Sequence, residues 1–274
     1  MDEIQNHAGI EKLQTYIPGF DLISEGGVPK GRTTLIAGTS GSAKTVFTMQ
    51  FLAAGIINAD EGAVFITFEE HPADIRQNVK GIGWDIQKWE DEGKFAFVDA
   101  SPDPGVEITE IGNYELDALL ARIKYAVKKV NARRVGIDSL GAIFSQFHEA
   151  AIVRRELFKI ITALREMGVT SLLTTERTQE YGDVGRYGVE EFVVDDVIIL
   201  RNVLDFEKRR RTIEILKFRG TSHHKGEYPF TIIPSRGIEI IPLSGMQLTQ
   251  KSSNTRISSG SSELDAMCGG GFFR

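Results

Sequence analysis

The sequence predicts an α/β fold with a mainly parallel central sheet that is flanked by helices and extended by antiparallel strands near the C-terminus. Strand-like and helix-like apolar runs alternate between Thr33 and Phe192, which is the pattern of a parallel sheet with helical crossovers. After Phe192 the helical spacing stops, and strand-like runs follow one another directly. We therefore expect the last strands to join the sheet in antiparallel fashion.

Each element is predicted from its own spacing. A continuous apolar run such as Ala63 to Phe68 indicates a strand that is covered on both faces of the sheet. The Pro- and Gly-containing stretch from Asp99 to Tyr114 is expected to be an exposed loop. We expect the other strands over 33–37, 94–98, 133–139, 169–176, 193–203, 212–218, 228–233 and 238–241, and helices over 46–57, 116–127 and 153–164.

Composition excludes several classes of protein. The 274 residues are 41% hydrophobic, enough for a sizeable core, and carry a net charge of −6, which does not favour nucleic acid or an anionic membrane surface. Cys268 is the only cysteine, so an intramolecular disulfide is excluded. No run approaches ~20 apolar residues, and the N-terminus has no signal-peptide pattern. We expect a cytoplasmic protein without a membrane segment.

An octapeptide between an apolar strand and an apolar helix predicts a nucleotide site. Its spacing, G-x-x-x-x-A-K-T, follows the phosphate-binding P-loop G-x-x-x-x-G-K-[ST]. In that loop, backbone N–H groups surround the phosphates, the lysine neutralises charge and the hydroxyl ligates Mg²⁺. We expect the nucleotide to be bound by Gly38, Thr39, Ser40, Gly41, Ser42, Ala43, Lys44, Thr45 and Val46.

Ala43 stands where the second glycine of the P-loop belongs. At a negative φ the alanine adds only a methyl group, whereas at a positive φ it strains the loop. The sequence leaves both conformations open. It also leaves open a degenerate site that binds nucleotide poorly, and a Gly/Ser-rich turn that binds nothing.

Acidic side chains end two of the predicted strands. Glu69 and Glu70 follow the run 63–68, and Asp138 ends a later apolar run in the manner of a Walker B aspartate. Because parallel sheets place ligands at the carboxyl ends of their strands, Glu69 and Glu70 can polarise an attacking water. Thr45, Asp138 and Glu69 are the candidate metal ligands. The alternatives are a solvated acidic pair and an aspartate that caps a turn.

Polar segments further along the chain leave more than one interpretation. Thr174 to Glu176, at a strand end, can sense a γ-phosphate or simply cap the sheet edge. Arg209 to Arg211 are most simply a solvated hairpin face, whereas the cationic segment from Lys217 to Lys225 can reach a neighbouring subunit's nucleotide, as arginine fingers do. His223 and His224 lack the partners that a metal site would need.

The end of the chain repeats its beginning. Leu264-Asp265 follows Phe20-Asp21 by 244 residues, and Gly270-Gly271 follows Gly26-Gly27 by the same 244 residues. We infer the first part of a tandem repeat, with 252–260 as a linker. The alternative is coincidence in a Gly/Ser-rich tail.

These motifs together resemble the KaiC family of circadian clock ATPases, over nearly the whole chain. The resemblance implies a RecA-like P-loop NTPase domain over 1–249, followed over 250–274 by a linker and the truncated start of a second KaiC domain. The segments that carry it are 38–45, Phe68 to Glu70, Asp99 to Pro104, Ile137 to Ser139, Arg186 to Phe192 and Lys217 to His223.

The resemblance also implies a function. It implies slow hydrolysis of ATP, with Mg²⁺, at the subunit interfaces of a homohexameric ring that acts as a timer or conformational switch and binds KaiB through the loop 99–114. The family's autophosphorylated Ser/Thr pair lies in the second domain, so this chain is not expected to autophosphorylate by that route. Ala43 and the loop 105–113 depart from the family pattern. The implied catalytic residues are Lys44, Glu69, Glu70 and Arg219, and those implied to contact the nucleotide from the adjacent subunit are Lys217, Phe218, Arg219, Thr221 and His223.

Two functions of other classes fit the same motifs. A RecA-like, DNA-dependent ATPase would be stimulated by single-stranded DNA, but the net charge of −6 argues against it. A non-hydrolysing hexameric scaffold would bind nucleotide at its altered P-loop only to assemble the ring.

Overall fold

A computed structural model describes residues 10–101, 113–144, 149–242 and 255–273. The chain divides into two compact units, 1–242 and 243–274. Within the described part, no helix is long and apolar enough to cross a membrane.

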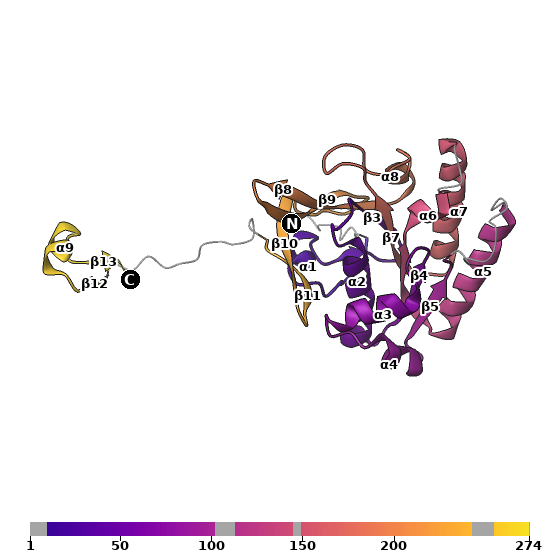
Figure 1. The fold of residues 1–274 in the computed structure, drawn as a ribbon, viewed down its shortest axis with the longest axis horizontal. Helices are drawn as coiled ribbons and strands as arrows, with labels where there is room; N and C mark the ends of the chain where they lie inside the picture. The colour runs from indigo at the N-terminus through magenta and orange to yellow at the C-terminus, as the bar shows by residue number, and fades with distance from the viewer. Residues whose placement is uncertain (1–9, 102–112, 145–148, 243–254, 274) are drawn as a thin grey trace, which may run out of the picture. The chain divides into compact units, whose positions relative to one another are not determined.

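The first unit is built on one sheet of nine strands in the order β11-β10-β9-β8-β3-β7-β6-β4-β5 (Figure 1). The predicted α/β class with a mainly parallel sheet is confirmed. Six adjacent strands of this sheet, β3 to β8, pair with one another in parallel. Their carboxyl ends therefore meet along one edge. The strands are β3 (Thr33–Gly38), β4 (Gly62–Thr67), β5 (Phe95–Asp99), β6 (Ala132–Asp138), β7 (Thr170–Glu176), β8 (Asp196–Asp205), β9 (Lys208–Phe218), β10 (Glu227–Ile233) and β11 (Gly237–Ile240).

The prediction that all strands after Phe192 are antiparallel is wrong for β8. β8 pairs in parallel with β3, and only β9, β10 and β11 extend the sheet in antiparallel fashion. The cause is the connection that precedes β8. Residues 177–189 and the short helix α8 (Glu190–Val193) return the chain from the carboxyl end of β7 to the opposite edge of the sheet. A strand that starts there can run parallel to β3.

Helices cover both faces of this sheet, and the strand side chains alternate between them (Figure 1). Ile36 points into the core beneath α2, while its neighbours Leu35 and Ala37 point into the core beneath α5 and α7. α2 is buried without interruption from Phe47 to Ile56, as its apolar sequence predicts. One face carries α1 (Phe20–Ile23), α2 (Lys44–Ala59), α3 (Pro72–Lys80) and α4 (Ile86–Asp91), and the other α5 (Asn113–Lys129), α6 (Leu140–Phe144) and α7 (Ala150–Glu166).

The loop expected between Asp99 and Tyr114 is only partly described. Asp99 ends β5, and α5 already begins at Asn113. Residues 102–112, on which the expected contact with a KaiB-like partner falls, lie outside the described residues.

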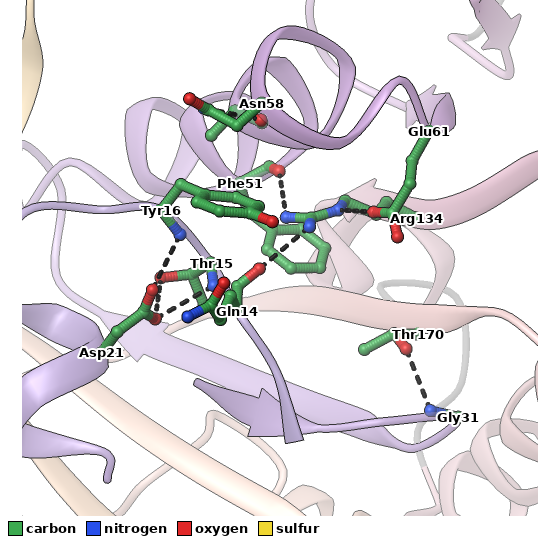
Figure 2. A network of polar contacts seen from close by, with 11 residues as sticks. Gln14, Thr15, Tyr16, Asp21, Gly31, Phe51, Asn58, Glu61, Arg134 and Thr170 are labelled. Atoms are coloured by element: carbon green, nitrogen blue, oxygen red, sulfur yellow. Dashed lines mark hydrogen bonds and ion pairs between the residues drawn. The ribbon is translucent and has the colours of Figure 1, made fainter. Parts of the chain in front are cut away.

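A buried cation joins β6 to α2 and to the N-terminal segment (Figure 2). Arg134 has no exposed side-chain surface, and its Nε lies 2.6 Å from Glu61 Oε2. Its other nitrogens donate to Phe51 O at 3.0 Å and to Gln14 O at 2.9 Å, and its guanidinium lies 4.7 Å from the Phe51 ring centre. Gly55 leaves the necessary space, because a Cβ there would lie 2.2 Å from Arg134 Nε.

The second unit has the local structure of the N-terminal segment. β12 (Arg256–Ile257) pairs with β13 (Phe272–Phe273) in the register in which β1 (Lys12–Leu13) pairs with β2 (Val28–Pro29), again 244 residues earlier. Asp265 Oδ1, in α9 (Ser262–Met267), accepts a bond from Ser259 N at 2.7 Å, as Asp21 Oδ1 does from Thr15 N at 2.9 Å. The linker expected over 252–260 therefore contains a strand.

Candidate functional site

A polar cavity of about 230 Å³ opens at the carboxyl ends of β3, β7, β6 and β4. These four strands are neighbours in the sheet, so side chains that follow them gather at one place. The cavity is lined by Ser40, Gly41, Lys44, Thr45, Thr67, Glu69, Glu70, Ile75, Asp138, Ser139 and Glu176.

The P-loop turns tightly between β3 and α2. Only glycine fits at position 38, because a Cβ there would lie 2.3 Å from Ser42 Oγ and 2.6 Å from Leu200 O. Ser42 is fully buried, and its hydroxyl donates to Thr39 O at 2.8 Å. Lys44 Nζ folds back onto the loop and donates to the Gly38 and Thr39 carbonyls at 3.0 Å each.

Ala43 has a left-handed backbone, with φ 75° and ψ 28°, immediately before α2. Of the two conformations that the sequence left open, the strained one is therefore present. Holding a residue with a Cβ in this region costs roughly 1–2 kcal/mol. The loop turns between β3 and α2 as a P-loop does, but the left-handed conformation of Ala43 destabilises this turn.

Asp138 connects two threonine hydroxyls at the floor of the cavity. Thr45 Oγ1 donates to Asp138 Oδ2 at 2.5 Å, and Thr174 Oγ1 donates to Asp138 Oδ1 at 2.5 Å. The first bond places the two side chains that were predicted to serve a metal directly beside each other. The second bond orients the aspartate, and the two alternatives that the sequence suggests for Thr174 stay predictions.

The adjacent carboxylates Glu69 and Glu70 follow shortly after β4 and line the same cavity as Asp138. Ser139 Oγ donates to Glu69 Oε1 at 3.0 Å, while Thr67 Oγ1 donates to the Glu70 backbone carbonyl at 2.5 Å. Burial, and then the negative charge of Asp138, raises the pKa of Glu70. A carboxylate with a raised pKa is a better proton acceptor for water than an ordinary one.

Lys44 is the one cationic side chain among the described residues that line this cavity. The lining also contains four carboxylates, those of Glu69, Glu70, Asp138 and Glu176. Burial lowers the pKa of Lys44, and the charge of Asp138 is the largest effect that opposes the shift. This excess of negative charge favours a bound cation. Among the described residues, no group of three or more His, Cys, Asp or Glu side chains could hold a metal alone, so a metal here would need further ligands from a nucleotide or water.

The residues expected to act on a neighbouring subunit's nucleotide lie away from this cavity. Lys217 Nζ donates to Glu191 O at 2.7 Å and to Val194 O at 2.9 Å, and Phe218 is a core side chain. Arg219 Nη2 lies 3.4 Å from Phe192 O, and the His223 ring packs edge-on against Phe218. Together with Thr221, they form one segment at the end of β9. Their action in trans stays a prediction.

The residues that line the cavity coincide only in part with those expected from the sequence to bind the nucleotide, whose role stays a prediction. Val46 packs against the core and does not line the cavity. Ser139 and Glu176 also line it. The sequence pattern assigned no specific role to Ser139, and it left Glu176 either to sense a γ-phosphate or to cap the sheet edge. Their position immediately after or at the end of a strand, as with Asp138, is the signal that could have found them.

Known proteins are similar to this chain in sequence. A model of the KaiC ATPase family matches residues 13–245. The chain belongs to the KaiC ATPase family. It is 62% identical to the circadian clock protein KaiC3 of Synechocystis sp. and 58% identical to the circadian clock oscillator protein KaiC of Synechococcus elongatus, in each case over 98% of this chain. These matches cover 53% and 51% of the two relatives, so the chain spans about half the length of either KaiC protein.

Proposed function

We propose that this KaiC-family chain hydrolyses ATP slowly at the interfaces between copies of itself in a homohexameric ring, and that the ring acts as a timer or conformational switch in a clock system. The observation that supports this most strongly is the hydrogen bond between Thr45 and Asp138, in the cavity that Glu69, Glu70 and Lys44 also line. Phosphate contact, metal support and activation of water are thereby provided in one place.

The residues fit Mg²⁺ and a nucleotide phosphate. Thr45 and Asp138 would hold the ion with Glu69 beside them, and the surplus of carboxylates over Lys44 suits a divalent cation. Bound there, Mg²⁺ would supply the positive charge that offsets the charge of the phosphates. Lys44 would leave the Gly38 and Thr39 carbonyls to contact the phosphates.

Glu70 is our candidate for the group that accepts a proton from the attacking water. Burial is the first cause of its raised pKa, and the charge of Asp138 is the second. Glu69 is held by Ser139 at 3.0 Å and is placed to orient the water or the metal. The proton therefore moves to a carboxylate at the open side of the cavity.

The cations for the transition state would come from an adjacent copy. Arg219, Lys217 and His223 lie outside the cavity of their own chain, so a role at the phosphates requires a neighbour. Lys217 would have to exchange the Glu191 and Val194 carbonyls for that contact.

We propose further that 1–249 is one ATPase domain and that 250–274 opens a second domain of the same kind. The support is the pairing of β12 with β13, which repeats that of β1 with β2. The relatives bear the names of circadian clock proteins. A KaiB-like protein, bound through the loop 99–114, is the partner that we propose on that basis.

Two measurements on the purified chain test this proposal. Formation of ADP is followed in a single turnover, and the assembly is sized with ATP and with ADP. We expect slow ADP formation and a sixfold assembly with ATP, both lost in Lys44→Ala. A ring that yields no ADP over days would favour the scaffold, and stimulation by single-stranded DNA would favour the DNA-dependent enzyme.

A further inference from the structure

We propose that Glu180 is a positioning residue for the P-loop, which holds Thr39 so that the loop keeps the shape that receives the phosphates of the nucleotide. The inference rests on the proposed function only in taking a nucleotide as the ligand. Glu180 lies in the connection between β7 and α8, far from any P-loop motif in the sequence.

The carboxylate of Glu180 bridges two segments that belong to neighbouring strands. Thr39 Oγ1, just after β3, donates to Glu180 Oε1 at 2.7 Å. The backbone N–H of Asn202, in β8, donates to Glu180 Oε2 at 3.0 Å. Arg201 Nε in turn donates to the Glu180 backbone carbonyl at 3.1 Å, so Glu180 is itself fixed to β8. The start of the P-loop is thus tied to a rigid strand through one side chain.

The backbone of the same part of the loop is held from the same connection. Arg177 N donates to Gly38 O at 3.0 Å, immediately before Thr39. On the far side of the turn, Arg211 Nε donates to Gly41 O at 3.2 Å. The loop is therefore held at its start and near its middle by groups from the connection after β7 and from β9.

These hydrogen bonds from outside the P-loop are important because the loop contains a residue in a strained conformation. Ala43 is held at φ 75°, and a residue in a sparsely populated region persists only where its surroundings determine it. A carboxylate close to a phosphate site also repels the ligand, so its presence requires a compensating role.

The test is a double-mutant cycle on the affinity of the full chain for Mg·ADP, measured by calorimetry. Glu180→Ala and Thr39→Val each remove the same hydrogen bond, so each is expected to weaken binding about tenfold. The double variant is expected to be little weaker than either single one. Thr39→Ser keeps the hydroxyl and should restore the affinity. In hydrolysis by Glu180→Ala, KM should rise while kcat at saturating ATP stays the same.

Gln179→Ala, at the exposed neighbouring position, is the control and should bind as the wild type does. Independent effects that multiply to about a hundredfold, or unchanged affinity in Glu180→Ala, would overturn the proposal. If Glu180→Ala does not fold, the comparison of Thr39→Val with Thr39→Ser decides alone. A wild-type chain that binds no nucleotide would instead contradict the proposed function, which this experiment therefore tests separately.

Discussion

The charged side chains at the two ends of β6 differ in whether neighbouring groups balance their charge. Near its amino end, Arg134 is fully buried, and its nitrogens donate to Glu61, Phe51 O and Gln14 O. At its carboxyl end, Asp138 faces a cavity that also contains Glu69 and Glu70, both exposed. One strand thus carries a satisfied cation at one end and an excess of anions at the other.

The two groups of charges therefore differ in role. Those around Arg134 stabilise the fold, and those around Lys44 are available to bind a ligand. The polar groups around Arg134 satisfy one another, so that network needs no further partner. The carboxylates around Lys44 exceed it in number and keep acceptor oxygens directed toward the cavity. Substitutions at the first end should therefore change stability, and those at the second should change nucleotide chemistry.

Arg134→Ala should have the largest effect on stability. It leaves a cavity, removes the donor to the Phe51 and Gln14 carbonyls and leaves Glu61 without its cation, for an expected loss of about 3–5 kcal/mol in the free energy of unfolding. Urea titration measures the loss, with Arg154→Ala on the exposed face of α7 as the matched control. A change below 1 kcal/mol would contradict the structural assignment. ATP turnover per folded molecule should not change.

Asp196→Asn tests a buried charge of the opposite kind at the start of β8. Asp196 is fully buried, its Oδ1 accepts from Arg219 N at 3.2 Å, and burial raises its pKa to about 7. Asp195, Arg32 and Lys217 are the other charges that act on it. Asparagine keeps the acceptor without the charge, so at pH 8 the variant should be more stable by on the order of 4 kcal/mol at most.

The pH dependence gives the sign of that effect. The folded pKa of about 7 lies above the ordinary value of 3.8, so the folded chain binds more protons than the unfolded chain between these values. The contribution of Asp196 to stability is thus complete below about pH 4 and is lost as the pH rises through 7. Urea titrations at pH 5 and pH 8 should show a larger gain for Asp196→Asn at pH 8. An equal gain at both would refute a titrating Asp196.

Ala43→Gly should have the smallest effect on stability of the three substitutions. Because Ala43 lies in the P-loop, the substitution should also affect nucleotide binding. Glycine relieves the left-handed strain, so we expect a gain of about 1 kcal/mol in the free energy of unfolding. Calorimetry with Mg·ATP should show equal or tighter binding than for the wild type. Weaker binding would mean that the alanine methyl group itself contributes to the site.

The sequence predicted what depends on local pattern. The alternation of strands and helices gave the parallel core, and spacing identified Lys44, Thr45, Asp138 and the Glu69–Glu70 pair, which do line one cavity. These predictions succeed because parallel strands gather their carboxyl ends at one edge, whatever the loops between them do.

What the sequence did not reveal depends on partners far along the chain. Arg134 was predicted only as part of a strand, because Gln14 and Glu61 lie 120 and 73 residues away from it. The direction of β8 depends on the connection after β7. The sign of φ at Ala43 depends on the turn between β3 and α2, where either conformation was compatible with the pattern.

The most direct test of the central claim is single-turnover ADP formation by the wild type and by Glu69→Gln/Glu70→Gln, with ATP bound to the same extent. We expect the double variant to keep its stability while ADP formation from bound ATP slows by at least about a hundredfold, since removal of a general base costs that much. An unchanged rate would show that the carboxylates at the end of β4 do not perform the chemistry.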